Sequence, residues 1–397
     1  MGKNKLISSA LLSLCLLGTT SSFAQWQIQN SGTSEDLNSI IFSDINTGWA
    51  CGKEGVLRHT TDGTTWMMQS SGTSYDLNDI SCQGQLLWIV GENGLIRHSI
   101  DGGTTWTTQT SNTFVELFAV SFFDASTGMA AGEGGVILKT VNGGTTWTIS
   151  QAGTGGSGSG SEEEEAGIAD IQMVSTTTAY VCGYGGYFAK TSDSGATWTL
   201  QTSGAVDDLE ALSFPSASQG FVAYTEGKVR KTNGTGTFTE VYAPTSKDLS
   251  GIHFLTNSKG WIVGEEGRIL LTNDAGVSWS THNLATVEED LKDVYFPSAD
   301  IGYICGKDGV ILKITNGQVA GINESVLSFS LAPNPAKDFI QINSTYKNLQ
   351  YAISDLQGKL VKTGTESTVD ISELKAGTYI ITLELDGKTV SQQLIKE

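Results

Sequence analysis

Residues Leu86 to Thr108 read LLWIVGENGLIRHSIDGGTTWTT. An apolar run leads into a Gly-x-x-Gly turn, a second run follows, and the eight-residue box SIDGGTTW ends the phrase. Variants of the phrase recur along the chain, and an acidic residue opens each copy, at Asp36, Asp76, Glu116, Asp170, Asp208, Asp248 and Asp290. Apart from a longer gap after Glu116, the spacing is about 40 residues with four short strand-like runs per copy, which is typical of a propeller blade. The repeat predicts an all-β fold, a seven-bladed β-propeller.

The first repeat shows how four strands fit one blade. We expect strands at Leu37 to Phe42, Gly48 to Cys51 and Val56 to His59, and a fourth strand opened by Trp66. A tight turn at Gly52 to Gly55 places glycine where a positive φ is needed.

The seventh repeat stops at Asn316-Gly317 without a box tryptophan or a fourth strand. Trp26 to Thr33, WQIQNSGT, matches the fourth-strand sequence WMMQSSGT that begins at Trp66. We therefore expect Trp26 to Gln29 to pair beside Val310 to Lys313 and close the ring. Closure removes the exposed sheet edges of an open array.

Composition divides the chain into segments. Basic residues, an apolar run and Ser22-Phe23-Ala24 predict a signal peptide at 1–24. Residues 25–320 are the expected propeller, and 153–167, GTGGSGSGSEEEEAG, predict a flexible acidic insert. Residues 321–397 lose the repeat, and their alternating runs predict a small C-terminal β-sandwich.

The chain is strongly acidic, with a formal net charge of -19, and the excess lies in the repeat region. Nucleic acid is excluded as a partner, because phosphate binding needs a basic footprint. No stretch after residue 24 is long and apolar enough to span a bilayer. We expect a monomer that uses no cofactor.

Three cysteines share one repeat position. Cys51, Cys182 and Cys305 stand where other copies have Val or Ala, and Cys82 takes a slot that Phe fills elsewhere. A position shared by Cys, Val and Ala is small and buried, so we expect free core thiols and no disulfide framework.

The boxes carry a resemblance to known proteins. SIDGGTTW at Ser99 to Trp106, with Val90 to Gly94 before it, resembles the Asp-box (BNR) repeats of sialidases, sortilins and, most closely, the photosystem II stability/assembly factor family. The resemblance covers Gln25 to about Gly317 and implies the propeller fold. We do not carry that family's role over to a secreted protein.

The C-terminal segment resembles the type A sorting domain of the type IX secretion system of Bacteroidota. The matching stretches are Pro333 to Asp338, Asp355 to Lys359, Leu374 to Tyr379 and Gln393 to Glu397. The resemblance implies the type IX machinery as a partner, passage across the outer membrane, removal of the tail and attachment to surface lipopolysaccharide.

An enzyme is the main alternative to a binding module. A sialidase needs an arginine triad, a tyrosine nucleophile with a partner acid, and a general acid. Arg58, Arg97 and Arg230 instead share one strand position of the repeat, and all nine tryptophans fall at repeat positions. The Asp-box acids are of the type that forms turns. We therefore predict no catalytic, cofactor-binding or metal site.

The acidic starts are the candidate ligand-facing residues. In a four-stranded blade the start of the first strand and the turn between the second and third strands share one face, so these acids gather there. They either cap strand ends and aid solubility, or form an acidic funnel for a cationic partner or divalent ions. We predict a secreted or cell-surface, non-catalytic binding or scaffold module, with an unknown protein or glycan ligand on this face. A glycosidase and a structural surface-layer component are the alternatives.

Overall fold

A computed structural model of the chain describes residues 26–150, 167–315, 330–343, 350–355, 359–385 and 388–397. The chain divides into two compact units, Met1–Gln318 and Val319–Glu397. The expected signal peptide, and the expected insert up to residue 166, lie outside the described residues.

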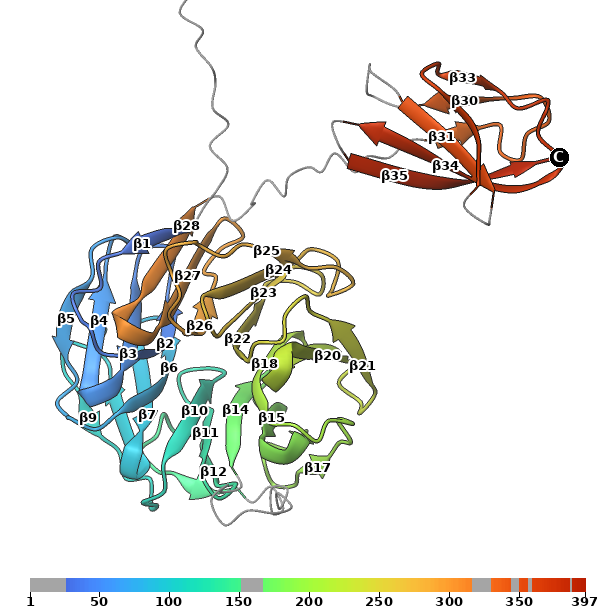
Figure 1. Cartoon of the computed structure of the whole chain (residues 1–397). Coiled ribbons are helices and arrows are strands. Elements are labelled where there is room, and N and C mark those ends of the chain that lie inside the picture. Colours follow the sequence, from blue (N-terminus) through green and yellow to red (C-terminus); the bar gives the residue numbers. More distant parts are fainter. Residues whose placement is uncertain (1–25, 151–166, 316–329, 344–349, 356–358, 386–387) are drawn as a thin grey trace, which may run out of the picture. The chain divides into compact units, whose positions relative to one another are not determined.

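The first unit is a β-propeller, as the repeat predicts. Within its described residues, seven antiparallel four-stranded sheets follow one another around a ring (Figure 1). Blade 1 consists of β2 (Leu37–Phe42), β3 (Gly48–Gly52), β4 (Val56–Thr60) and β5 (Met67–Ser70). Blade 2 consists of β6 (Leu77–Gln83), β7 (Leu86–Gly91), β8 (Leu95–Ser99) and β9 (Thr107–Thr108). Blade 3 consists of β10 (Leu117–Phe122), β11 (Gly128–Gly132), β12 (Ile137–Thr140) and β13 (Thr148–Ile149).

Blades 4 to 7 repeat the pattern. Blade 4 consists of β14 (Ile168–Met173), β15 (Ala179–Gly183), β16 (Tyr187–Thr191) and β17 (Thr199–Leu200), and blade 5 of β18 (Leu209–Ser216), β19 (Gln219–Tyr224), β20 (Lys228–Thr232) and β21 (Phe238–Tyr242). Blade 6 consists of β22 (Leu249–Phe254), β23 (Gly260–Gly264), β24 (Arg268–Thr272) and β25 (Ser280–Thr281). Blade 7 consists of β26 (Leu291–Tyr295), β27 (Ile301–Gly306) and β28 (Ile311–Thr315), together with the N-terminal strand β1 (Gln27–Gln29). The first strand of each blade lies nearest the centre of the ring (Figure 1).

The N-terminal strand closes the ring. β1 pairs antiparallel with β28, with Gln27 opposite Lys313 and Gln29 opposite Ile311. Trp26 is only 3% exposed, and its ring meets that of Trp261 edge-on with centroids 5.5 Å apart. The closure expected from the sequence is therefore confirmed.

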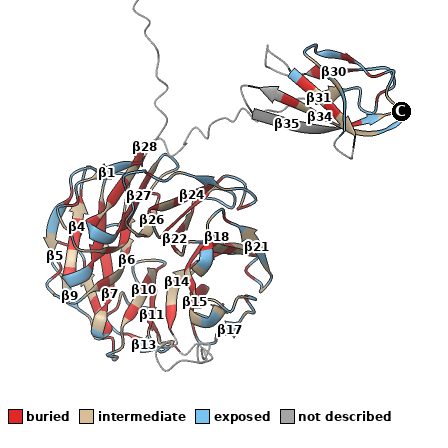
Figure 2. Cartoon of the chain, viewed as in Figure 1, coloured by how far each residue is buried: buried red, intermediate tan, exposed pale blue. Residues whose placement is uncertain are grey.

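The Gly-aromatic pair of each repeat packs neighbouring blades together. The ring of Phe42 lies against Gly48 of its own blade, where a Cβ would come within 2.5 Å of the ring. Phe42 also stacks on Tyr303 of blade 7, with centroids 3.8 Å apart. Glycine thus leaves room for one ring, and the aromatic residue after it covers a ring of the next blade. The buried residues concentrate on the inner strands of the blades (Figure 2).

The turn between the second and third strands is tighter than a simple hairpin. A single 3-10 turn occupies η1 (Lys53–Gly55), and the same geometry recurs at η2 (Glu92–Gly94), η3 (Tyr184–Gly186), η4 (Thr225–Gly227) and η5 (Lys307–Gly309). In η1 both Glu54 (φ 53°) and Gly55 (φ 72°) are left-handed. A Cβ on Gly55 would meet the Thr73 carbonyl oxygen at 2.1 Å, so glycine is required there.

The cysteines behave as expected from their repeat positions. Cys51, Cys182 and Cys305 are buried and free, and Cys82 is free and half-buried. Cys82 faces Leu87 across the sheet of blade 2, where blades 1, 3 and 6 pair Phe with Gly. The larger Leu thus faces the smaller Cys at this pair.

The second unit has two sheets that enclose a core. One holds β29 (Ser330–Ala332), β30 (Phe339–Asn343) and β33 (Thr368–Asp370), and the other holds β31 (Gln350–Asp355), β32 (Leu360–Gly364), β34 (Gly377–Leu385) and β35 (Lys388–Lys396). Ile340 and Ile342 of the first sheet and Ile353 and Ile381 of the second belong to one buried cluster. The alternating runs thus give a β-sandwich, because one face of each sheet is apolar.

Candidate binding site at the mouth of the central channel

Five of the candidate acids hold neighbouring blades together. Each accepts a hydrogen bond from the backbone N–H of the left-handed turn residue of the preceding blade. The pairs are Asp36 with Asp308 (3.1 Å), Asp76 with Glu54 (2.8 Å), Asp208 with Gly185 (2.8 Å), Asp248 with Glu226 (2.7 Å) and Asp290 with Glu266 (3.2 Å). Glu116 instead accepts from the side-chain amide of Asn78, at 2.8 Å. The repeated acid therefore caps the junction between blades.

Two of these acids also form ion pairs on the same face. Lys53 lies 3.0 Å from Asp36, and Lys307 lies 2.6 Å from Asp290. The hydrogen bond from Lys307 lowers the pKa of Asp290. Both lysines are largely exposed, so each pair adds little to the stability of the fold.

Asp170 does not belong to the acidic series, which corrects the sequence-based assignment. Asp170 faces Cys182 across blade 4, as Ser39 faces Cys51 in blade 1. The residue equivalent to Asp36 is Gly167, whose carbonyl oxygen accepts the N–H of Tyr184 just as that of Asp36 accepts the N–H of Lys53. Gly167 is buried and belongs to the blade, so the acidic insert ends before it.

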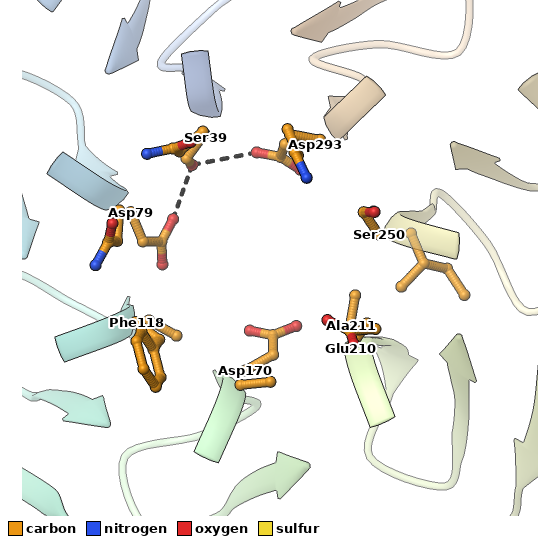
Figure 3. A pocket seen from close by; sticks show the side chains of 15 residues that line it. Ser39, Asp79, Phe118, Asp170, Glu210, Ala211, Ser250 and Asp293 are labelled. Atoms are coloured by element: carbon orange, nitrogen blue, oxygen red, sulfur yellow. Dashed lines mark hydrogen bonds between the residues drawn. The ribbon is translucent and has the colours of Figure 1, made fainter. Parts of the chain in front are cut away.

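Asp170 instead lines the mouth of the central channel (Figure 3). The cavity has a volume of ≈ 140 Å³, and each blade contributes the two residues that follow its first strand residue. The upper tier is Asn38, Asn78, Phe118, Ala169, Glu210, Ser250 and Lys292, in blade order. The lower tier is Ser39, Asp79, Ala119, Asp170, Ala211, Gly251 and Asp293. The residue type varies around each tier, although the backbone that carries it repeats from blade to blade.

The three lower-tier carboxylates bridge neighbouring blades. One oxygen accepts the N–H of the next residue in its own strand, and the other accepts an N–H from the inner strand of the following blade. The second bonds join Asp79 to Val120 (2.7 Å), Asp170 to Leu212 (2.8 Å) and Asp293 to Ile40 (2.9 Å). The blades that receive these bonds carry Ala or Ser at the same tier, which leaves room for the carboxylate.

Two of these carboxylates share one hydroxyl group. The Ser39 Oγ lies 2.8 Å from Asp79 Oδ1 and 3.2 Å from Asp293 Oδ2 (Figure 3). Burial raises the pKa of Asp79 to about 8 and also raises that of Asp293. Ser39 has one proton to donate, so the second contact is a hydrogen bond only when that carboxyl group carries a proton of its own.

The upper tier contains two charges without a partner. Asn38 and Asn78 donate to the carbonyl oxygens of Leu77 and Leu117 of the next blade, both at 2.9 Å. Glu210 and Lys292 make no hydrogen bond or ion pair with any residue that the structure describes. Burial, and then the charges of Asp208 and Asp248, raise the pKa of Glu210 to about 7, against the attraction of Lys292. Both charged groups are therefore available at the mouth.

Neither tier was predicted from the sequence. Each first strand begins with the same kind of residue, a Leu in six blades and Ile168 in blade 4. The two residues after it differ from blade to blade, although the rest of the phrase repeats, and this variation was the signal.

The other chemically suggestive residues are occupied by the fold. Arg58 donates to the carbonyl oxygen of Gly32 at 2.7 Å, Arg230 donates to that of Ser203, and the Trp49 indole donates to that of Gly102 at 3.1 Å. Asp101 accepts the backbone N–H of Thr105 at 2.8 Å, as expected for a turn former. In the described ranges, no group of three or more His, Cys, Asp or Glu side chains is arranged to hold a metal ion.

These features define an Asp-box β-propeller whose channel mouth carries unlike side chains from each blade. The sequence matches the family described as photosynthesis system II assembly factor YCF48 over residues 19–157 and 231–335, more than half of the chain, and the chain belongs to this family. No curated protein matches the chain.

Solved structures share the propeller fold. YCF48 bound to D1 peptide is 19% identical, with a TM-score of 0.62, and the match covers 75% of this chain and 96% of that one. YCF48 from Cyanidioschyzon merolae is 20% identical, with a TM-score of 0.63 over 74% and 99% of the two chains. A streptogramin B lyase is 13% identical, with a TM-score of 0.61 over 74% and 98%. An enzyme thus shares the fold, so the fold alone does not decide between binding and catalysis.

The second unit is a secretion signal carried by a folded domain. Residues 330–397 match the secretion system C-terminal sorting domain. The protein is therefore exported by the type IX secretion system, to the cell surface or the extracellular space. Within the described residues, no helix has the length and apolar character needed to cross a bilayer.

Proposed function

We propose that the propeller is a non-catalytic binding module and that its ligand, a segment of another protein, docks at the mouth of the central channel. The observation that carries the proposal is the upper tier, in which seven equivalent positions hold residues of six types. A merely structural ring has no need of such variety. Glu210 and Lys292 are also left without a partner among the described residues, which suits groups that meet a ligand.

A protein ligand is favoured over a glycan. The similar structure YCF48 bound to D1 peptide shows that a propeller of this family takes a peptide. All nine tryptophans are used at repeat positions, and six of them are buried, so they offer no stacking platform for a sugar. Export to the surface places the module where a peptide segment of a surface or extracellular protein could reach it. Attachment of the mature propeller to lipopolysaccharide remains part of this proposal.

A glycosidase is disfavoured because the arginines and carboxylates that could serve catalysis are already bonded to the backbone. Arg58 and Arg230 bind backbone carbonyl groups, so they are not free to hold a substrate carboxylate. The lower-tier carboxylates are held by backbone N–H groups from two blades each. The acidic ring of Asp36, Asp76, Glu116, Asp208, Asp248 and Asp290 contributes a negative field around the mouth, in addition to its capping role.

A plug at the mouth tests the proposal. Ser250→Trp places a large side chain on the rim in blade 6, and Ser258→Trp places the same side chain in the loop of that blade on the opposite face. Both proteins are used as bait in culture supernatant and in the solubilised cell envelope. We expect a bound protein on the wild type and on Ser258→Trp that is absent from Ser250→Trp. Equal capture by both variants, or turnover of a glycan by the wild type, would refute the proposal.

A further inference from the structure

Blade 4 replaces the capping acid with an aromatic wall. A Cβ built on Gly167 would lie 3.1 Å from Cε2 of Tyr184 and 3.3 Å from Cε2 of Phe118. Both rings therefore lie close to this glycine, at the place where six other blades carry an acid. Both rings are half-buried, and Phe118 lines the cavity at the mouth. A side chain at position 167 would crowd both rings, and glycine leaves them this space.

A carboxylate without a partner stands beside this wall. Figure 3 shows Phe118, Asp170 and Glu210 along one side of the mouth, with Asp170 between the other two. Phe118 and Glu210 line the same cavity, and burial and then the charge of Glu210 raise the pKa of Tyr184. Asp170 is held by the backbone N–H groups of Ile171 and Leu212. Glu210 has no such partner among the described residues.

Aromatic rings and a free carboxylate near the rim of a cavity favour a cation with a flat, weakly hydrated surface. A guanidinium group can pair with a carboxylate through two N–H groups and stack on a ring at the same time, which a small hydrated ion cannot do. We propose that Phe118, Tyr184 and Glu210 form a subsite for an arginine side chain of the docked protein segment. The subsite rests on the proposed function and names the chemistry of its ligand.

The rest of the mouth limits where the arginine can lie. Lys292 belongs to blade 7 and is separated from Glu210 by Ser250 of blade 6. Its charge repels a second cation at that side and leaves room for a carbonyl or carboxylate group of the same segment. The charges that face Glu210 are Asp208, Asp248 and Lys292, and Asp170 lines the same cavity. Deprotonation of Glu210 creates the charge that the guanidinium needs, so binding strengthens from pH 6 to pH 8.

The test uses the full protein and a capped peptide, acetyl-Ala-Ala-Arg-Ala-Ala-amide, titrated by calorimetry at pH 8 and low salt. The comparison peptide carries citrulline, which keeps the shape of arginine and removes its charge. We expect the citrulline peptide and the Glu210→Gln variant each to weaken binding about tenfold, which is about 1.4 kcal/mol. Phe118→Leu keeps an apolar side chain, removes the ring, and should weaken binding about three- to tenfold.

Glu288→Gln is the matched control, because it removes the same charge from an exposed position on the same face. It should change the affinity less than about twofold at moderate salt, since exposed charges are screened over about 8 Å. An equal loss in Glu288→Gln and Glu210→Gln would mean diffuse attraction and would overturn the subsite, as would equal binding of the citrulline peptide or no binding of the arginine peptide. The plug experiment does not depend on arginine, so a protein that binds the wild type and not Ser250→Trp would leave the module standing while the subsite falls.

Discussion

The hydroxyl of Ser39 between two carboxylates makes the stability of the propeller depend on pH in a direction that can be worked out. Asp79 and Asp293 have raised pKa values in the folded state, chiefly because they are buried. A carboxyl group with a raised pKa binds more protons in the folded protein than in the unfolded chain. The free energy of unfolding therefore falls as the pH rises from about 4, the usual Asp pKa, toward the folded-state value.

The magnitude follows from the number of groups. Each pH unit by which a folded-state pKa is raised costs about 1.4 kcal/mol once the pH exceeds it. The rise of the pKa of Asp79 to about 8 would thus remove up to about 5 kcal/mol between pH 4 and pH 8, and the raised pKa of Asp293 adds to the loss. The Ser39 hydroxyl donates to Asp79 at the shorter distance and opposes the rise there. Ser39→Ala should therefore steepen the loss, with stability near that of the wild type at pH 4 and lower at pH 8.

Urea unfolding between pH 4 and pH 8 measures this, followed by tryptophan fluorescence. All tryptophans lie between Trp26 and Trp279, so the signal reports the propeller and not the sorting domain. Asp79→Asn is the control, because it cannot ionise and should flatten the difference between pH 4 and pH 8. Asp170, Glu210 and Lys292 line the same cavity and contribute equally to wild type and variant. If wild type and Asp79→Asn lose stability with the same slope, the shared-proton account is wrong.

Three further predictions follow from the fold and the tail. Trp26→Ala should lower the free energy of unfolding by about 3–5 kcal/mol, as should the equivalent Trp66→Ala, because both rings are buried; an unchanged urea midpoint for Trp26→Ala alone would show that the N-terminal strand does not hold the ring. Hydrogen bonds from Thr105 lower the pKa of Asp101 to about 2, so the stability from this turn is present above pH 4 and is lost as the pH falls further; Asp101→Ala should lower the melting temperature at pH 7 more than at pH 2.5, and an equal drop at both would contradict the turn's dependence on the charge. Deleting residues 322–397 should leave the propeller in the periplasm of a type IX-competent host, and a protease-accessible truncated protein on intact cells would disprove that the tail is needed.

The repeat made most of the fold predictable. Comparison of the sequence repeats predicted the strands of blade 1 and the pairing of Trp26 to Gln29 with the last blade. It could do so because equivalent residues of a propeller occupy equivalent places in the packing of each blade. The alignment of the repeats was wrong in blade 4, because Asp170-Ile171 has the same pattern as Asp36-Leu37 but lies a few residues further along the blade. The unusual spacing after Glu116 removed the cue that would have placed Gly167 at the strand start.

The candidate site was less accessible to the sequence. Ser39 and Asp293 are 254 residues apart, and they meet only because the ring closes and brings blade 7 beside blade 1. The side chains that differ among blades were visible in the sequence. Their convergence on one cavity depends on the distance of the first strand from the axis, which the pattern of residues does not give.

This face carries two kinds of acidic residue, those that repeat in the blades and stabilise the fold, and Glu210, which does not repeat and is open to a ligand. The residues that repeat, such as Asp76 and Asp248, are bonded to the backbone of the preceding blade, so their side chains are committed to holding the ring together. Glu210 lies next to this series, does not repeat, and has no bond of that kind among the described residues. A ligand that paired with the repeated acids would have to compete with bonds that stabilise the propeller, whereas a ligand that pairs with Glu210 gains an interaction that the fold leaves unmade. In a propeller of nearly equal blades, a ligand is therefore recognised at positions where the side chains differ between blades while the backbone stays the same.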